Sequence, residues 1–294
     1  MSSHLVILNP VAGRGRVRRE WPGMAQALRA AGVSFDLVET KAPGEAVDIA
    51  QRAALEYDAV IAAGGDGTVH EVVNGLLRAG GGAALGVLPL GSGDDFVKML
   101  PARDAVARIV VPEVRALDAG RIRAGDAERF FANGMDIGFG AHASRNVRNV
   151  PALFTGLGAY LGALALTLVR YPKLEVRLQL DGGAPIAQTT AMTAVMNGRA
   201  FGGSFHVCPE ARVDDGELDL LIADGVGRWE ILGLVPRIMR GTHVGDPRLR
   251  LARARRVLIE SAAPLLVEAD GEIVFEDARR LEIEVLPGAL RVLA

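Results

Sequence analysis

Apolar residues in the first part of the chain form short runs that alternate with longer segments of helical spacing. The short runs predict buried strands, and the longer segments predict amphipathic helices. The strands are expected at residues 5–8, 33–38, 59–63 and 84–88, and the helices at 16–30, 44–56, 68–77 and 96–100. This order predicts a parallel sheet with right-handed crossovers, whose ligands bind at the carboxyl ends of the strands.

The pattern changes near residue 118, where short runs of strand-like residues take over. Strands are expected at 129–137, 174–180, 186–196, 217–222, 256–260, 265–269, 272–275 and 281–285, with a helix at 229–240. Asp181-Gly182 and Asp270-Gly271 are typical of tight hairpin turns, so this half is expected to be mainly antiparallel. We therefore predict an α/β domain at residues 1–120 and a mainly antiparallel β domain at residues 121–294.

The third predicted strand leads into Gly64-Gly65-Asp66-Gly67, where the backbone can turn sharply without side chains in the way. Thr68 and Glu71 have the spacing of a capping box, so a helix is expected to start here. The turn would expose N–H groups at the positive end of a helix dipole, which together favour phosphate. Glycine-rich turns also occur widely in α/β proteins that bind no phosphate there.

The other strand ends of the first domain carry small or polar residues as well. Residues 9–13 (Asn-Pro-Val-Ala-Gly) follow the first strand, Thr40 follows the second, and a turn at residues 89–96 follows the fourth. Ser92 in this last turn can donate a hydrogen bond to phosphate, whereas Asp94 or Asp95 can cap the helix that follows. The turns are therefore expected to converge on one site.

A basic run follows the first of these turns. It consists of Arg14, Arg16, Arg18 and Arg19. Arginines beside a helix N-terminus suit a polyphosphate, and a cationic patch also suits an anionic membrane surface. A solvated helix face is the ordinary alternative, and the sequence leaves these interpretations open.

Two acidic turns in the second half are candidates for chemistry. Asp270-Gly271-Glu272 joins two apolar runs and is first of all a hairpin signal, but it would also present two carboxylates to a cleft. Phosphoryl transfer to an alcohol needs a group that accepts the hydroxyl proton. Residues 212–217 form a second acidic turn, which suits either a plain connection or a hard cation held by one carboxylate and backbone carbonyls.

Composition narrows the class of protein further. The 294 residues carry a formal net charge of −2, so there is no general electrostatic case for binding nucleic acid. Cys208 is the only cysteine, so no intramolecular disulfide can form, and a reducing cytoplasmic setting fits. Residues 151–169 contain no charged side chain but are diluted by glycine and threonine, which favours a buried or lipid-facing helix over a membrane span.

The string from Gly64 to Thr68 resembles the nucleotide-binding signature of the superfamily that contains diacylglycerol kinases, sphingosine kinases and NAD kinases. The chain as a whole resembles the bacterial diacylglycerol-kinase-like lipid kinases from Leu5 nearly to its C-terminus. The segments that carry this resemblance are residues 9–13, 40, 65–71, 89–96, 133, 138–139, 197–198, 202–203, 209–219 and 270–272.

This resemblance implies an enzyme that transfers the γ-phosphate of ATP, with Mg²⁺, to a hydroxyl of a membrane lipid such as diacylglycerol. It implies a Rossmann-like, NAD-kinase-like nucleotide domain, followed by a β-sandwich domain that takes the lipid. The expected location is cytoplasmic and peripheral, at the inner face of the membrane. A homodimer is compatible with the sequence, which does not fix the oligomeric state.

The resemblance also assigns roles to individual residues. Glu272 and Asp270 would supply the base and orient the acceptor, and Asp66 would act on metal or on the hydroxyl. Asp215, with the carbonyls of Arg212 and Glu217, would hold a structural Mg²⁺. The nucleotide would be bound by Asn9, Pro10, Gly13, Thr40, Gly64, Gly65, Asp66, Gly67, Thr68, Glu71 and Ser92.

Three departures from the family pattern bear on this reading. Ser92 replaces a threonine and keeps the hydroxyl, Asp94 replaces an asparagine, and Gly140 stands where an acid is common. The added charge of Asp94 would weaken ATP binding or demand another metal, so a catalytically silent nucleotide or lipid sensor is one alternative. An NAD kinase, which shares the glycine signature, is the other.

Overall fold

The computed structural model describes residues 3–91, 93–150, 157–170, 173–202 and 204–294. The chain forms two compact units: the first contains residues 1–118 and 287–294, and the second contains residues 119–286. Two strands, β5 (Val114–Ala124) and β13 (Glu272–Leu293), contribute residues to both units. The break lies close to the expected position, but the last eight residues, which were expected in the second domain, belong to the first unit.

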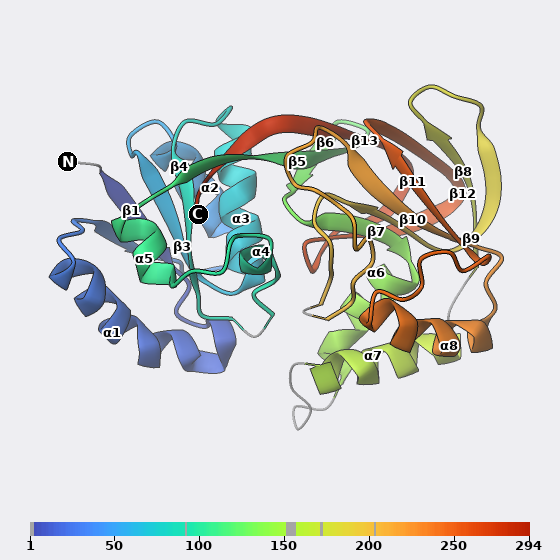
Figure 1. Cartoon of the computed structure of the whole chain (residues 1–294), viewed down its shortest axis with the longest axis horizontal. Helices are drawn as coiled ribbons and strands as arrows, with labels where there is room; N and C mark the ends of the chain where they lie inside the picture. The colour runs from blue at the N-terminus through green and yellow to red at the C-terminus, as the bar shows by residue number, and fades with distance from the viewer. Residues whose placement is uncertain (1–2, 92, 151–156, 171–172, 203) are drawn as a thin grey trace. The chain divides into compact units, whose positions relative to one another are not determined.

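The first unit contains a sheet in which neighbouring strands pair in parallel (Figure 1). Its order is β2 (Asp36–Glu39), β1 (His4–Leu8), β3 (Ala59–Gly64) and β4 (Ala84–Pro89), and the end of β13 pairs with β4. The helices are α1 (Arg16–Ala30), α2 (Glu45–Ala53), α3 (Asp66–Arg78), α4 (Asp95–Lys98) and α5 (Ala105–Val110). Apolar residues of α1 and α5 pack in one core cluster with β1, β3 and β4.

The second unit is built from antiparallel pairs. Its main order is β11 (Leu249–Ala254), β10 (Leu218–Asp224), β9 (Ile186–Met196), β7 (Gly134–Gly138), β12 (Arg256–Ala269) and β13. In addition, β8 (Leu174–Leu180) pairs with β9 and β12, and β5 pairs with β13 and with β6 (Ala127–Phe131). The helices are α6 (Phe139–Asn146), α7 (Leu157–Arg170) and α8 (Arg228–Met239).

The strands of the second unit differ from the sequence prediction in where they break. The single strand expected at 129–137 is two strands, β6 and β7, because the chain turns at Ala132 and Asn133. The four strands expected between 256 and 285 are only two, β12 and β13, which continue through irregular pairing near residues 260–267. β-Bulges keep such strands paired where the apolar alternation lapses, so the sequence pattern suggested breaks that the backbone does not make.

The predicted capping box at the start of α3 is wrong. The helix begins at Asp66 after Gly65, and no side chain caps it. The Glu71 carboxylate instead accepts the N–H groups of Gly44 at 2.9 Å and Ala46 at 3.1 Å. Glu71 thus caps the neighbouring helix α2, a long-range partner that sequence spacing cannot reveal.

Candidate functional site

Three glycine turns of the first unit pack backbone against backbone at the carboxyl ends of β1, β3 and β4. A Cβ atom on Gly91 would lie 2.6 Å from the Cα atom of Gly65, and one on Gly13 would lie 2.5 Å from the carbonyl oxygen of Leu90. Gly13 also has a φ of +58°, a conformation that favours glycine. The structure therefore brings together three of the four turns that the sequence placed at strand ends.

Asp66 ties the turn after β3 to the turn after β4. Its two carboxylate oxygens accept the N–H groups of Asp94 and Asp95, each at 2.8 Å, so that Asp66 caps the short helix α4. A Cβ atom on Gly93 would lie 2.5 Å from an Asp66 oxygen. Burial raises the pKa of Asp66 to about 6, and the negative charge of Asp95 acts in the same direction.

Asn9 joins the turn after β1 to helix α3. Its Nδ2 donates to Oγ1 of the buried Thr68 at 3.1 Å. A Cβ atom on Gly64 would lie 2.4 Å from the same Oγ1, so glycine at this position makes room for the hydroxyl. Pro10 is half-buried in the turn after β1, and Gly67 is half-buried at the start of helix α3.

The remaining predicted nucleotide residues lie after the second strand, on helix α3 or outside the described residues. Thr40 follows β2 and donates its N–H to the carbonyl of Leu8 at 2.9 Å. Glu71 is engaged with the start of α2, as described above. Ser92 lies outside the described residues.

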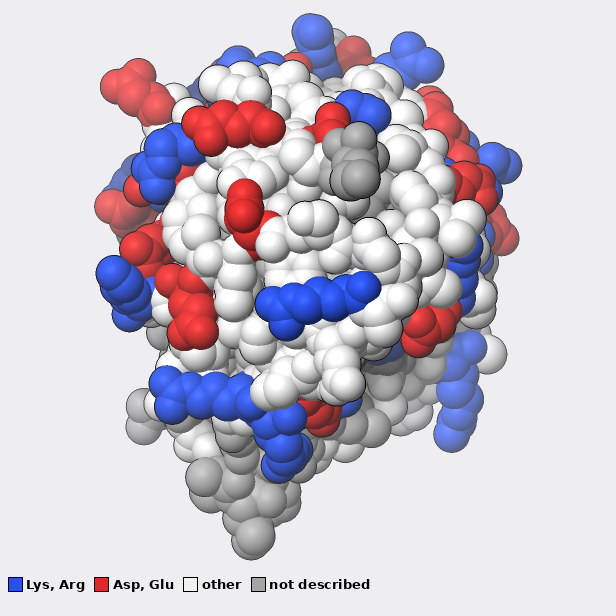
Figure 2. All heavy atoms as spheres, turned by 90° about the vertical axis from the view of Figure 1, so that its left-hand side faces the viewer, with Lys and Arg blue, Asp and Glu red and all other residues white. Residues whose placement is uncertain are grey.

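Two cations hold the turn after β4. The Arg16 guanidinium donates to the carbonyl of Gly91 at 3.0 Å, and the Lys98 ammonium donates to the carbonyl of Gly93 at 2.7 Å. Arg16 also pairs with Glu20 at 2.8 Å. On the face of the first unit drawn in Figure 2, basic and acidic side chains are interspersed among uncharged ones. Within the arginine run, Arg16 thus reaches a glycine turn from helix α1.

In the second unit, Asp270 and Gly271 form the two-residue turn between β12 and β13. Their φ angles are +51° and +92°, and Ala269 pairs with Glu272 across the turn, which confirms the predicted hairpin. The Asp270 carboxylate accepts three backbone N–H groups, those of Ala132 (2.9 Å), Asn133 (2.9 Å) and Gly134 (3.1 Å). Asp270 thus fixes the irregular segment between β6 and β7.

The acidic turn at residues 212–217 lies beside Arg253, a basic residue that was not among the predicted site residues. The Arg253 guanidinium, on β11, contacts the carboxylate of Asp215 and pairs with Glu217 at 3.1 Å and Asp219 at 3.5 Å. The Asp215 carboxylate also accepts the N–H of Glu217 at 3.2 Å. Arg212 pairs with Asp214 at 3.5 Å.

Two buried acids, Asp136 on β7 and Glu268 on β12, were not among the predicted site residues. They pair directly across the two strands. Burial raises the pKa of both carboxyl groups. Glu268 interrupts an otherwise apolar predicted strand, and Asp136 stands between Met135 and Ile137 in another. An acid between apolar neighbours in a strand is the signal that would have singled them out.

Each of the two units matches a known protein family. Residues 3–122 match the model of the diacylglycerol kinase catalytic domain, and residues 133–294 match that of the YegS C-terminal NAD kinase beta sandwich-like domain. A diacylglycerol kinase of Mycobacterium tuberculosis is 32% identical over 98% of this chain and 93% of its own length. A diacylglycerol kinase of Bacillus subtilis is 28% identical over 91% of this chain and 88% of its own length.

Solved structures show the same fold. A crystal structure of a diacylglycerol kinase from Bacillus anthracis has a TM-score of 0.73 at 23% identity, covering 99% of this chain and 96% of the other. Yeast NADH kinase, solved with NADH, has a TM-score of 0.53 at 9% identity, covering 99% of this chain and 82% of the other.

An NAD-kinase-like fold with a C-terminal β-sandwich domain, preceded by a lipid-kinase catalytic domain, defines an ATP-dependent lipid kinase. The chain belongs to the family of bacterial diacylglycerol-kinase-like lipid kinases.

Proposed function

We propose that the protein transfers the γ-phosphate of ATP, with Mg²⁺, to the hydroxyl of a membrane lipid such as diacylglycerol. The observation that carries the proposal is the contact among the glycine turns at Gly13, Gly65 and Gly91. Backbone N–H groups and a helix N-terminus at strand ends form a site for phosphate, which needs no side chain in the way. The names of the related diacylglycerol kinases support the class of acceptor.

In this proposal the first unit binds the nucleotide. The phosphates lie on the turn at residues 64–68, beside Asn9 and Gly13, and the nearby cations of Arg16 and Lys98 offset part of their charge. Asp94 donates its N–H to Asp66, so Asp94 takes part in building the turn after β4.

In the second unit, the contacts of the acidic turn favour Glu272 over Asp270 as the base. Three backbone N–H groups already occupy the Asp270 carboxylate, so its oxygens are engaged in holding the segment between β6 and β7. Asp270 is then a positioning residue that holds the turn, and Glu272 accepts the proton of the lipid hydroxyl.

Magnesium in this proposal accompanies the nucleotide and neutralises phosphate charge. The additional structural Mg²⁺ expected at Asp215 does not fit the arrangement of the described residues. One oxygen of Asp215 accepts the N–H of Glu217, and the other contacts the Arg253 guanidinium, which a cation would have to replace. No step of the proposed reaction therefore passes through that position.

Action at a membrane surface is supported by two helices of the second unit. α7 and α8 pack inner residues such as Leu164, Ile231 and Leu234 in the same core cluster and leave large apolar side chains outside. The most exposed of these are Trp229 (77%) and Val169 (67%). Residues 137–174 contain basic side chains but no acid, which suits an anionic lipid surface. None of the helices in the described residues is long and apolar enough to cross a bilayer.

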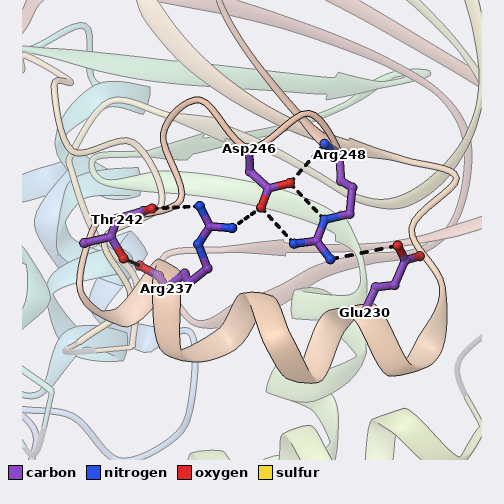
Figure 3. Close-up of polar contacts among 5 residues, drawn as sticks. All are labelled: Glu230, Arg237, Thr242, Asp246 and Arg248. Atoms are coloured by element: carbon purple, nitrogen blue, oxygen red, sulfur yellow. Dashed lines mark hydrogen bonds and ion pairs between the residues drawn. The ribbon is translucent and has the colours of Figure 1, made fainter.

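Ionic contacts join α8 to the segment that follows it in the chain (Figure 3). Asp246 accepts hydrogen bonds from Arg248 at 2.8 and 2.9 Å and also contacts Arg237 of the helix. Arg248 lies 3.9 Å from Glu230, near the start of α8. The hydrogen bonds from Arg248 hold the pKa of Asp246 well below its usual range, so the network persists at neutral pH.

The proposal is tested by transfer of labelled γ-phosphate from ATP into a bacterial lipid extract in the presence of Mg²⁺. Wild type is compared with Glu272→Gln and with the matched control Glu276→Gln, an exposed acid on the same strand. We expect a labelled lipid from wild type and from the control but not from Glu272→Gln. No labelled lipid with diacylglycerol present, together with intact ATP binding, would contradict the proposal, and label on NAD would identify an NAD kinase.

A further inference from the structure

Asp136 and Glu268 form a buried pair of acids in the second unit. The two residues are direct partners in the register of β7 and β12, and they are only 1% and 3% exposed. Two unpaired carboxylates at this depth would repel each other and would both lack solvation. The pair therefore needs a compensating charge or a proton.

The surroundings of Asp136 supply N–H groups. A Cβ atom on Gly140 would lie 1.9 Å from an Asp136 oxygen, so the carboxyl group fills the space beside the start of α6. Neither oxygen accepts a hydrogen bond of ordinary geometry from an N–H group, an amide or a hydroxyl side chain of a described residue. The N–H groups of Gly140 and Ala141 act on the carboxyl group electrostatically and favour its charged form.

The surroundings of Glu268 connect the pair to the catalytic turn. The Glu268 carboxyl group accepts the N–H of Gly271, the residue between Asp270 and Glu272. The negative charge of Asp270 acts on Glu268 and disfavours its ionisation.

The other elements around the pair bring no compensating cation to it in the part of the chain that the structure describes. On α6 the basic side chains are His142 and Arg145, which contact each other at 3.5 Å. Across the sheet, β9 places Ala194 opposite Asp136, and β13 places Ile273 opposite Glu268.

We propose that Asp136 and Glu268 share one proton in the folded protein, and that the pair positions the Asp270-Gly271-Glu272 turn through the N–H of Gly271. The second part rests on the proposed function, because it makes Asp136 and Glu268 positioning residues for Glu272. The proton lies on Glu268, whose hydroxyl donates to the Asp136 carboxylate while its carbonyl oxygen accepts from Gly271. The N–H groups of Gly140 and Ala141 stabilise the charge that remains on Asp136.

The direction of the pKa shifts agrees with this arrangement. Burial raises the pKa of Glu268 well above its ordinary value, and the neighbouring Asp136 charge raises it further. Burial also raises the pKa of Asp136, while its hydrogen bond with Glu268 lowers it. Glu268 is thus the partner that keeps the proton as pH rises.

The first test needs no enzyme activity. A folded state that retains a proton which the unfolded chain releases makes the unfolding equilibrium constant rise about tenfold per pH unit. Wild type, Asp136→Asn, Glu268→Gln and the exposed control Glu276→Gln are unfolded in urea between about pH 5 and pH 8. We expect this contribution in wild type and in the control, and its loss in Glu268→Gln. In Asp136→Asn the contribution should end at a lower pH, because Glu268 stays buried but the Asp136 charge no longer raises its pKa. Equal pH slopes in all four proteins would overturn the shared proton.

The second test reports on the turn itself. Hydrogen exchange is measured on a peptide that contains Gly271, in Glu268→Gln and in Glu268→Ala. Glutamine keeps a carbonyl acceptor for the Gly271 N–H, whereas alanine removes it. We expect wild-type protection with glutamine and at least tenfold faster exchange with alanine. Equal exchange in the two variants, or failure of glutamine to preserve protection, would overturn the positioning role.

The same variants separate this inference from the proposed function. In the lipid phosphorylation assay, Glu268→Ala is expected to lower kcat by tenfold or more while leaving the KM for ATP within about twofold of wild type, and Glu268→Gln is expected to retain kcat. Unchanged kcat in Glu268→Ala would contradict the positioning role. If wild type phosphorylates no lipid, the proposed function fails, while the unfolding and exchange results still decide the proton and the turn.

Discussion

Gly65 and Gly91 touch backbone to backbone, and this contact joins the turns that follow β3 and β4. The two positions are not equivalent. A Cβ atom on Gly91 would lie 2.6 Å from the Cα atom of Gly65, whereas one on Gly65 would lie 3.3 Å from the Cα atom of Gly91. A Cβ atom therefore does not fit at Gly91 without a backbone shift. At Gly65 a Cβ atom fits after a displacement of a few tenths of an ångström.

This asymmetry predicts different effects of alanine at the two glycines. Gly91→Ala is expected to lower the free energy of unfolding by about 1–3 kcal/mol, because the backbone must shift to relieve the overlap. The shift displaces the turn at residues 64–68, so ATP affinity should fall at least tenfold. Gly65→Ala should lower both the free energy of unfolding and the ATP affinity by less than Gly91→Ala does. Urea unfolding and titration calorimetry with ATP measure the two quantities.

Gly23 provides the matched control for these substitutions. It lies inside α1, and nothing stands within 4 Å of a Cβ atom built on it. Gly23→Ala should raise the free energy of unfolding by about 0.5–1 kcal/mol through helix propensity and leave ATP binding unchanged. Wild-type ATP affinity in Gly91→Ala would contradict the assignment of the glycine contact to the nucleotide site.

The raised pKa of Asp66 predicts a pH-dependent stability. In the folded protein this pKa is about 6 instead of 3.8, so the folded state binds a proton that the unfolded chain releases. The stabilisation is complete below the unfolded pKa and is lost as pH rises to about 6, by an amount of the order of 2–3 kcal/mol. Asp66→Asn, compared by urea unfolding with the exposed control Asp126→Asn, should remove this dependence.

The amide introduced by Asp66→Asn also has a structural cost at all pH values. Two carboxylate oxygens accept from Asp94 and Asp95, and an amide retains only one acceptor. We therefore expect Asp66→Asn to weaken ATP binding through a looser turn after β4. A wild-type pH slope in the variant would show that another group binds the proton.

The contact between Gly140 and Asp136 predicts a coupling between two substitutions. Gly140→Ala should destabilise the protein by about 1–3 kcal/mol, because its methyl group would overlap the Asp136 carboxyl group. Asp136→Ala removes that group, so alanine at 140 should cost much less in the double variant. A double-mutant cycle on the free energy of unfolding measures the coupling.

Gly233→Ala tests whether the effect is specific to this contact. Gly233 lies in α8 with nothing within 4 Å of its Cβ position. Alanine there should stabilise the protein by about 0.5–1 kcal/mol. Additive effects of the substitutions at 136 and 140 would mean that the two side chains do not compete for the same space.

The sequence predicted features that depend on local chemistry. Helix α1 follows the expected 16–30 range, and the Asp270-Gly271 hairpin forms as its two residues suggest. Glycine turns at strand ends were recognisable because few other residues permit such geometry. These features are encoded within a few neighbouring residues, so a single sequence is enough to predict them.

Contacts between distant segments could not be predicted in this way. Glu71 caps α2 from α3, and Arg253 reaches the acidic turn from another strand. The pairing of Asp136 with Glu268 depends on the register of two strands that are far apart in the chain. Sequence spacing identifies the charged group in each case but not its partner, because tertiary packing decides the partner.

Arg253 predicts how the protein responds to removal of metal. Its guanidinium already balances Asp215 and Glu217, so a chelator should leave the melting temperature of the nucleotide-free protein unchanged. Arg253→Ala leaves these acids without their cation, and Mg²⁺ should then raise the melting temperature. Thermal unfolding with EDTA or with Mg²⁺ measures both effects. A fall in the wild-type melting temperature with EDTA would restore the structural Mg²⁺ site.

The exposed apolar face of α7 and α8 predicts binding to anionic membranes. Trp229 and Leu232 on α8 are 77% and 48% exposed, and burying both in a bilayer interface would contribute about 1.5–3 kcal/mol each. Trp229→Ser with Leu232→Ser should therefore weaken binding to anionic vesicles at least tenfold, as measured by co-sedimentation, without changing ATP affinity. Leu251→Ser, at an exposed leucine of β11, should bind as wild type. If Leu251→Ser weakens vesicle binding as much as the double substitution on α8, the α8 face has no particular part in membrane binding.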